Sequence, residues 1–481
     1  MMYSKQRLRE VTDLKRKAVR RIQTDIWEIH TSPNRKYIEE FSQEFDSFEA
    51  ICQPNDLLTD ALDANLVWVG DYHALTKSQL YAADLLTRIA RRKDRVALAV
   101  EPIFARNQDV LNLWMAGKIS EEEFLSRVRY QDEWGCDWTG YKALFERARE
   151  LRVPVYGVDC HPRNDMRSIG RRDLSIARQI ARLMHKDPNQ TLMIVFGESH
   201  LASNHLPGRV RDILDRKKIA SRQVVILQNI DPLYWALQET GHGEAQAVRV
   251  REACYCVFNA TPIEKYESFR QYLHKCIEED LSGDWTLLAQ TLIEVMMDFL
   301  EIKKNDSVVS HMPAIDGIQV SIAAEEFARR IHQACRGELT KPFARAANDE
   351  FFVKVIENGL GYFCSKLLDS SRDGIESLAE RVLPHIGRDD RFTRAIELLV
   401  DPGKRPGAQH FKALRCAIEA KAGKQKTRRM LSQLLGYALG RRLYHAYLQS
   451  RISRKDIQAL FNDPLNTPNR PLECYRELHM L

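Results

Sequence analysis

Two segments of the chain share one pattern, in which an apolar run leads directly into Gly-x-x-His. They are LVWVGDYH at 66–73 and LMIVFGESH at 192–200. Apolar runs of this length that end at glycine are typical of buried strands in a parallel sheet. Open α/β sheets place ligand-binding groups at the carboxyl ends of their strands. We therefore expect His73 and His200 to lie at the same edge of one sheet.

Strand and helix patterns alternate from about residue 66 to 260. This alternation predicts an α/β fold, with a mainly parallel sheet and helices on both faces. The predicted strands are 66–69, 96–100, 153–158, 192–196, 224–227 and 255–258. Two capping-box patterns, Thr76 with Gln79 and Ser120 with Glu123, predict helix starts between these strands.

Beyond about residue 276 the strand patterns nearly vanish and helical patterns replace them. The predicted helices include 285–304, 323–335, 351–368, 392–400 and 430–449. In the last, Gly436 and Gly440 form a flat strip, which predicts close packing against another helix. With 481 residues we expect several domains. These are an N-terminal helical extension (1–50), an α/β domain (51–275) and an all-helical C-terminal domain (276–481).

Composition and charge narrow the class of protein. The N-terminal segment is too charged for a signal peptide, and no apolar stretch is long enough to span a membrane. The ten cysteines include no CxxC pair, which is typical of reduced thiols. We therefore expect a cytoplasmic protein without a membrane span. Residues 403–455 contain fourteen Lys or Arg and one acidic residue, Glu419, which suits either an anionic partner or a solvated helical surface.

Polar groups follow each predicted strand, so they should converge at one edge of the sheet. Our candidate metal ligands are His73, Glu101 and His200, because nitrogen and carboxylate ligands suit zinc, manganese, cobalt or ferrous iron. Three protein ligands leave an open position for a water that the metal activates. Glu101 is alternatively a general base. Tyr72 is the candidate residue for binding a cofactor.

Other residues near these strand ends have two interpretations each. Glu198, Asp159 and His161 are candidate bases or groups that orient a ligand, although Pro162 also suits a simple turn. His205 has no counterpart in the first segment, so we expect it to be structural. The arginines that follow the third strand suit an anionic substrate or a solvated helix start; they are Arg163, Arg167, Arg171 and Arg172.

Several families of enzymes are excluded by their missing motifs. The chain has no P-loop, no GxGxxG and no GxSxG sequence, which argues against nucleoside triphosphate binding, dinucleotide binding and serine-hydrolase chemistry.

At these motifs the chain resembles the superfamily that joins ChaN-like haem-binding proteins, Tiki metalloproteases and erythromycin esterases. The resemblance rests on GDYH at 70–73, on Glu101 in LAVEPI and on GESH at 197–200, with looser similarity in HLPGRV and in VFNATPIEKYESF. It covers about residues 60–269. Similarity to Tiki-like members implies hydrolysis with a divalent metal on His73, Glu101 and His200. Similarity to ChaN-like members implies haem binding or iron acquisition.

Three functions compete at this point. The first is a metal-dependent hydrolase of an ester, amide or peptide bond, acting on a small molecule or peptide. The alternative is a haem- or iron-binding protein without turnover. In the third, the basic helical half binds a partner such as nucleic acid, which we rank last because the chain has no nucleic-acid motif. The sequence does not indicate an oligomeric state.

Overall fold

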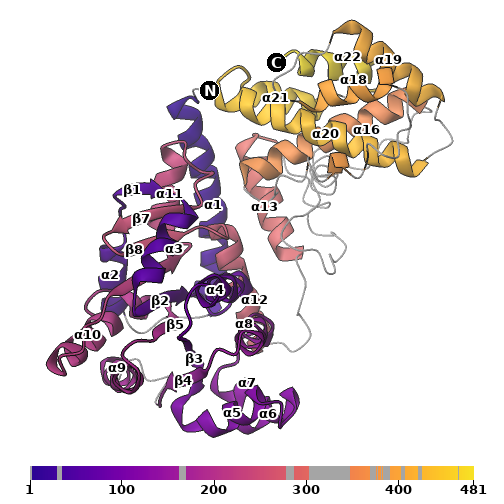
Figure 1. Ribbon diagram of the computed structural model, residues 1–481. Coiled ribbons are helices and arrows are strands. Elements are labelled where there is room, and N and C mark those ends of the chain that lie inside the picture. Colours follow the sequence, from indigo (N-terminus) through magenta and orange to yellow (C-terminus); the bar gives the residue numbers. More distant parts are fainter. Residues whose placement is uncertain are drawn as a thin grey trace. The chain divides into compact units, whose positions relative to one another are not determined.

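The computed structural model describes residues 3–29, 35–161, 169–277, 286–302, 347–368, 375, 378–380, 382, 390–401, 407–420, 425–463 and 465–481. Contacts divide the chain into two compact units (Figure 1). The α/β unit is Asp25–Ile277, and the helical unit combines Met1–Thr24 with Glu278–Leu481. The predicted domain boundaries at 50 and 275 stay predictions.

In the described residues, eight strands form one sheet in the α/β unit. Their spatial order is β1 (Ala50–Cys52), β7 (Ala247–Arg251), β8 (Cys254–Val257), β6 (Gln223–Gln228), β2 (Leu66–Asp71), β5 (Thr191–Gly197), β3 (Val96–Phe104) and β4 (Val155–Asp159). The strands from β8 to β4 are parallel, while β7 is antiparallel to both β8 and β1. The predicted α/β class is confirmed.

The sequence did not predict β1 and β7, which lie at one side of the sheet. β1 has three residues and exposes Ile51. In β7, Arg249 and Arg251 alternate with Val248 and Val250. Neither strand has the continuous apolar run that marks the buried parallel strands, because one face of each is partly exposed.

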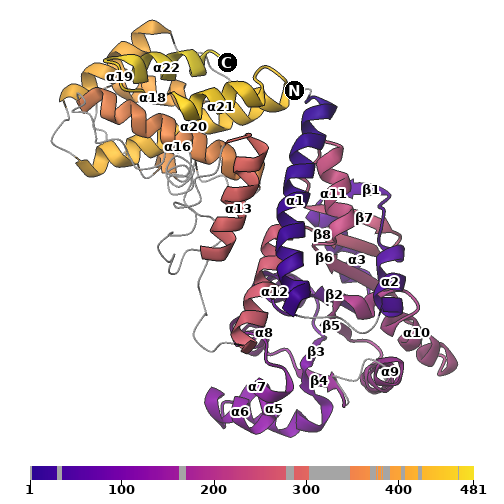
Figure 2. The same ribbon diagram turned by 180° about the vertical axis from the view of Figure 1, so that it is seen from behind.

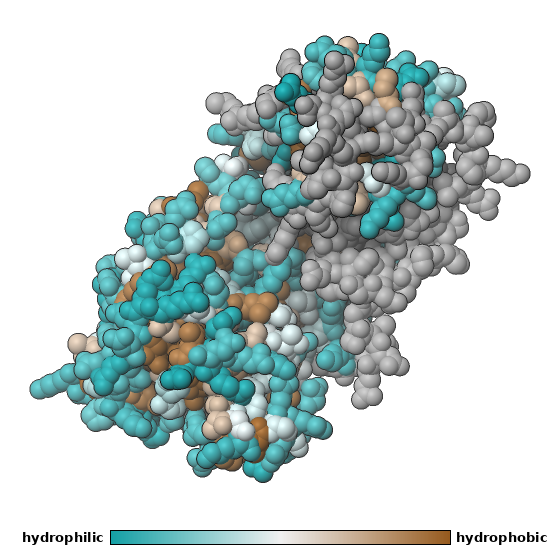
Figure 3. Space-filling view, turned by 45° about the vertical axis from the view of Figure 1, so that its right-hand side comes forward, coloured by the Kyte–Doolittle hydropathy of each residue, from teal (hydrophilic) through white to brown (hydrophobic). Residues whose placement is uncertain are grey.

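Helices cover both faces of the sheet (Figure 1 and Figure 2). Val67 and Val69 belong to one core and Leu66 and Trp68 to the other, as the twofold alternation of a strand requires. The first core includes α3 (Pro54–Asp63), α4 (Thr76–Ala90), α5 (Gln108–Met115), α6 (Glu121–Val128) and α8 (Trp138–Glu150). The second includes α2 (Arg35–Glu44), α9 (Ile169–Lys186), α10 (Leu206–Arg216) and α11 (Asp231–Glu239). Short α7 (Tyr130–Glu133) and the longer α12 (Pro262–Ile277) complete the unit. The face of this unit that Figure 3 shows is mainly hydrophilic, with hydrophobic patches.

The two predicted capping boxes have different outcomes. Ser120 caps α6, and its hydroxyl accepts a hydrogen bond from the Glu123 amide at 3.1 Å. Thr76, in contrast, is already the first residue of α4, whose N-cap is Leu75 without a side-chain hydrogen bond. The predicted box of Thr76 and Gln79 is therefore wrong. Gln79 is buried and its side chain bonds to Asp71 instead.

The helical unit contains α1 (Lys5–Ile29) as far as Thr24. It also contains α13 (Thr286–Phe299), α16 (Ala347–Leu367), α18 (Asp390–Val400), α19 (Ala408–Ala420), α20 (Gln425–Leu448), α21 (Arg454–Asn462) and α22 (Arg470–His479). The helical class of this region is confirmed, although the helix predicted at 323–335 lies outside the described residues. Arg21 of α1 pairs with Glu294 and Asp298 of α13 at 3.0 and 2.7 Å. No helix in the described part of the chain has both the length and the apolar character to cross a membrane.

Helices α16 and α20 approach closely at the predicted glycine strip. A Cβ atom on Gly436 would lie 2.3 Å from Asn358 Cβ, and one on Gly440 would lie 2.5 Å from the Gly359 carbonyl oxygen. Neither position has room for a side chain, so the prediction of tight helix packing is confirmed.

Two arginines of the basic 403–455 run have a structural role. Arg441 and Arg442 donate hydrogen bonds to the carbonyls of Val400 and Asp401, at the end of α18. Cations at this end of a helix compensate its unpaired carbonyl groups. Part of the basic run thus stabilises a helix end.

Candidate functional site

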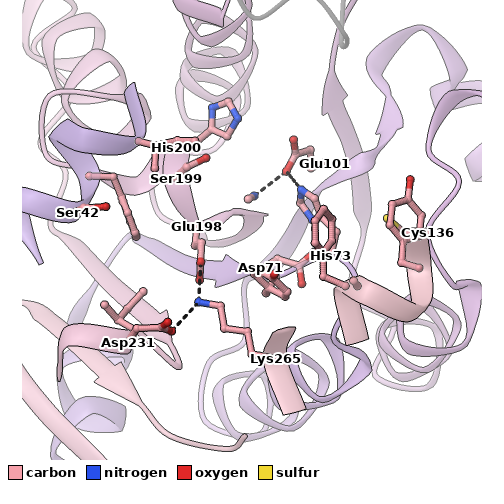
Figure 4. Close-up of a pocket in the computed structure, with 18 of the residues that line it drawn as sticks. Ser42, Asp71, His73, Glu101, Cys136, Glu198, Ser199, His200, Asp231 and Lys265 are labelled. Carbon is pink, nitrogen blue, oxygen red and sulfur yellow. Dashed lines mark hydrogen bonds and ion pairs between the residues drawn. The ribbon is translucent and has the colours of Figure 1, made fainter. Parts of the chain in front are cut away.

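The parallel strands bring the polar groups of their carboxyl ends to one pocket of about 590 Å³. His73 follows β2, Glu101 lies within β3, and Glu198 and His200 follow β5 in a 3₁₀ turn, η3 (Glu198–Leu201). All four line the pocket (Figure 4). Tyr72 lines it as well. This convergence follows from the parallel register, in which Asp71 pairs with Gly197 across β2 and β5.

His73 is held by a carboxylate two residues before it. Its Nδ1 lies 2.9 Å from Asp71 Oδ2, and an ionised carboxylate only accepts, so Nδ1 donates. The hydroxyl of Tyr141 donates to the same oxygen of Asp71, and Gln79 Nε2 donates to the other at 2.5 Å. With Nδ1 protonated, a neutral His73 has its free lone pair on Nε2.

The Nε2 atom of His73 faces Glu101, whose Oε2 is 3.7 Å away. Burial alone would lower the pKa of His73, but attraction to Glu101 and the hydrogen bond to Asp71 outweigh it and raise the pKa above its ordinary value. A distance of 3.7 Å is too long for a direct hydrogen bond and short enough for one water to contact both groups.

Glu101 is fixed from two sides. Its Oε2 accepts the amide of Gly197 at 2.6 Å, and its Oε1 accepts Arg172 at 2.6 Å. Arg172 is buried and also donates to both oxygens of Asp159, at 2.8 and 2.9 Å. Burial would lower the pKa of Arg172, but Glu101 and Asp159 raise it above its ordinary value. Arg172, predicted as a possible anion ligand, thus pairs with carboxylates of the chain itself.

The glycines of the two Gly-x-x-His motifs have different roles. A Cβ atom on Gly197 would lie 3.1 Å from His73 Nε2 and 3.3 Å from Glu101 Oε2. At Gly70 the nearest atoms would be at 3.5 Å, which is ordinary contact. A side chain at position 197 would therefore make tighter than ordinary contacts with His73 and Glu101, whereas one at position 70 would not.

His200 has a different environment from His73. Its Nδ1 lies 2.8 Å from Asp173 Oδ1, and Tyr37 of α2 donates to Asp173 Oδ2 at 2.7 Å. The Tyr37 hydroxyl is also 3.0 Å from His200 Nδ1. Burial alone would raise the pKa of Asp173, but the hydrogen bonds from His200 and Tyr37 lower it below its ordinary value. Sequence reasoning missed both Tyr37 and Asp173, which lie within amphipathic helices and follow no strand.

The predicted metal ligands are brought to one pocket, but they do not form a metal-binding group. His73 and Glu101 are neighbours, whereas the Nδ1 of His200 is directed to Asp173. Across the described residues, no cluster of three or more His, Cys, Asp or Glu side chains is arranged to hold a metal ion. The predicted metal site on His73, Glu101 and His200 therefore stays a prediction.

Comparison with known proteins supports the predicted resemblance. Residues 57–176 match the family model described as "Haem-binding uptake, Tiki superfamily, ChaN".

Over this segment the chain is similar to the ChaN/Tiki superfamily.

Among solved structures, "Cofacial heme binding to ChaN of Campylobacter jejuni" is similar at 13% identity and a TM-score of 0.29, covering 38% of this chain and 91% of that one. No curated protein matches the chain. The ChaN/Tiki match includes His73, Glu101 and Asp173, while His200 and Tyr37 lie outside it.

A buried lysine on α12 forms the opposite part of the pocket. Lys265 Nζ donates to Glu198 Oε1 at 3.0 Å and to the Asn229 carbonyl at 3.1 Å, and it lies 3.7 Å from Asp231 Oδ1 (Figure 4). Burial raises the pKa of Glu198. Sequence reasoning did not single out Lys265, although it belongs to the VFNATPIEKYESF segment that carries part of the ChaN resemblance.

Haem, which the ChaN name implies, fits this pocket poorly. Burial raises the pKa of Tyr72, which opposes the phenolate that iron would need. Tyr72 also lies beneath Lys265, whose Nζ is 4.8 Å from its ring centre. Lys265 and Arg172 are paired with carboxylates of the chain, so neither is available to neutralise two haem propionates without breaking an existing pair.

The remaining predicted residues lie at the margin of the site. Asp159 reaches it through Arg172, as described above. His161 is half-exposed beside Glu133, with 3.5 Å between Nε2 and Oε2, and packs on Phe104. His205 is buried against Tyr37 and bonds to Glu40 at 3.1 Å, a structural role as expected. Arg163 and Arg167 lie outside the described residues.

Proposed function

We propose that the α/β unit is a hydrolase of an ester, amide or peptide bond in which His73 is the general base. The observation that carries the proposal is the Asp71–His73 pair, with 2.9 Å between Oδ2 and Nδ1 and with Nε2 directed to Glu101 at 3.7 Å. A histidine held in this way by a carboxylate accepts a proton at Nε2 and is stabilised once charged.

The reaction begins with a water molecule between His73 Nε2 and Glu101 Oε2. His73 takes one proton of the water while the water oxygen attacks the carbonyl carbon of the substrate. When the bond to the leaving group breaks, His73 returns the proton to that group. Asp71 stabilises the imidazolium between these steps, and the hydrogen bond from Arg172 holds Glu101 in place.

The test is hydrolysis of a panel of para-nitrophenyl esters and anilides by the full-length protein. We expect the His73→Gln variant to lose about 10²–10⁴-fold in kcat/KM, the usual contribution of a general base. His242→Gln, which changes an exposed histidine in a loop, is the matched control and should retain full activity. Equal rates for wild type and His73→Gln would overturn the proposal.

Metal dependence is the finer question at the same site. If His73, Glu101 and His200 bind a metal after rearrangement, the purified protein will contain about one divalent ion per chain, and the His73→Ala, His200→Ala double variant will lose it. Equal metal content in the two proteins would leave water activation to His73 and Glu101 alone.

Haem binding without turnover is the second candidate, supported by the ChaN family match over residues 57–176. Titration with haem should then produce a Soret band that weakens in a Tyr72→Phe variant. An unchanged spectrum in wild type would remove this candidate.

A further inference from the structure

The pocket has the opposite charge from the chain as a whole. The chain carries a formal charge of +6. The pocket is lined by five carboxylates and two cations, a net charge of −3 with its histidines neutral. The carboxylates are Asp71, Glu101, Glu133, Glu198 and Asp231, and the cations are Arg172 and Lys265. A cleft lined by one sign of charge concentrates ligands of the opposite sign.

The excess of negative charge is most evident around Lys265. One carboxylate would neutralise this lysine, but two carboxylates lie beside it. Glu198 and Asp231 both pair with it, at 3.0 and 3.7 Å (Figure 4). One buried oxygen of each, Glu198 Oε2 and Asp231 Oδ1, receives no hydrogen bond within the described part of the chain. The formal charges of this group of three sum to −1, because it has two carboxylates and one ammonium group.

Aromatic side chains form much of the remaining wall. Trp134 stands edge-to-face on His73 with 4.5 Å between ring centres, while Phe269 contacts Tyr72 and stacks on Tyr272. All four aromatic residues line the pocket. Such a combination of aromatic rings and carboxylates binds organic cations. The rings attract the cation by cation–π interaction and the carboxylates attract it by Coulomb interaction.

We propose that the substrate carries an organic cation, an amine or a quaternary ammonium, on an apolar body that places its scissile carbonyl bond at His73. This inference rests on the proposed hydrolase function for the carbonyl group, but the cation preference itself comes from the charge and the aromatic walls. The same features oppose dianionic ligands, haem among them.

The activity test compares three para-nitrophenyl esters of similar size. Their acyl groups are trimethylammonium butyrate, its uncharged tert-butyl counterpart and glutarate. We expect kcat/KM to fall in this order, with at least about a tenfold difference between cation and neutral ester, equal to about 1.4 kcal/mol. The difference should shrink as salt is raised, because mobile ions screen the pocket charge.

The binding test separates this inference from the hydrolase. The primary amides of the trimethylammonium and tert-butyl acids are titrated calorimetrically into the His73→Gln variant, which should not turn them over. Tighter binding of the cation with no ester hydrolysis by wild type would support the cation site and overturn the hydrolase. Hydrolysis without charge preference, or equal binding of both amides, would overturn the cation site.

Variants localise the effect. Glu198→Gln combined with Asp231→Asn keeps the side-chain shapes and should reduce the cation-to-neutral binding ratio toward one. Glu252→Gln removes an exposed carboxylate from the turn before β8, at the opposite end of the sheet, and should leave the ratio unchanged. Circular dichroism checks that each variant is folded. If the double variant kept the cation-to-neutral binding ratio of the wild type, the assignment of the cation preference to Glu198 and Asp231 would be wrong.

Discussion

The two Gly-x-x-His motifs of the α/β unit have the same spacing and opposite environments. The side chain of His73 is 32% exposed, and its carboxylate partner belongs to the same motif. The side chain of His200 is 7% exposed, and its partners Asp173 and Tyr37 come from two distant helices. Strand-end placement thus brings a histidine to the pocket, but the elements packed around it decide whether its ring is available to a substrate.

The comparison predicts its largest effect at the two histidines themselves. His73→Gln should abolish most ester hydrolysis while changing stability little, because the ring is partly exposed. His200→Gln should act mainly on stability, by about 1–3 kcal/mol, because it leaves Asp173 and Tyr37 buried with an incomplete network. Steady-state kinetics and urea denaturation of both variants separate the two roles. Similar kinetic losses at both positions would show that His200 also reacts.

Substitution of the two motif glycines should also have unequal effects, with a larger loss of activity at Gly197 than at Gly70. Gly197→Ala places a methyl group 3.1 Å from His73 Nε2 and displaces it from Glu101, so we expect a loss of about 10- to 100-fold in kcat/KM. Gly70→Ala meets only ordinary contacts at 3.5 Å and should retain most activity. Comparable losses in the two variants would remove the claimed importance of the His73–Glu101 gap.

Removing one buried carboxylate tests the His200 network directly. Asp173→Ala leaves His200 Nδ1 and the Tyr37 hydroxyl without their shared acceptor, so we expect a loss of about 1–3 kcal/mol in the free energy of unfolding. Glu252→Gln, at an exposed turn, serves as the control. A change below about 0.5 kcal/mol would mean that water replaces the network at no cost.

The smallest predicted effect is a shift in pH dependence. His73 must be neutral to act as a base, so kcat/KM should rise with pH through a pKa above the ordinary histidine value. Asp71→Asn removes one of the charges that raise this pKa, and the acidic limb should therefore move to lower pH, by up to about one unit. Profiles between pH 5 and 9 measure the shift, and movement to higher pH would contradict the assigned partner.

Part of the site followed from the sequence and part did not. The rule that strand ends converge was sufficient to place His73, Glu101 and His200 in one pocket. It did not identify Tyr37, Asp173 and Lys265 as site residues, because they lie within helices whose orientation depends on tertiary packing. Gln79 was assigned to a helix cap because its spacing from Thr76 suited one, while burial beside Asp71 gave it a stronger partner.

The fold could be predicted from the sequence more completely than the site, for a related reason. Buried strands β2 and β5 are continuous apolar runs that identify themselves locally. The function of a polar residue depends on neighbours far away in the chain. Arg172 illustrates this, since its sequence context suggested an anionic substrate and its neighbours Glu101 and Asp159 supply the negative charge instead.

The 3.0 Å contact between the Tyr37 hydroxyl and His200 Nδ1 also sets an order of events during synthesis. The two residues are 163 positions apart. At roughly 5–20 residues per second, Tyr37 leaves the ribosome about 8–33 s before its partner. Throughout that interval Phe41 of α2 and Phe45, which follows the helix, lack the complete core that later buries them. The nascent N-terminal segment is therefore the part of this chain that we expect to need a chaperone most.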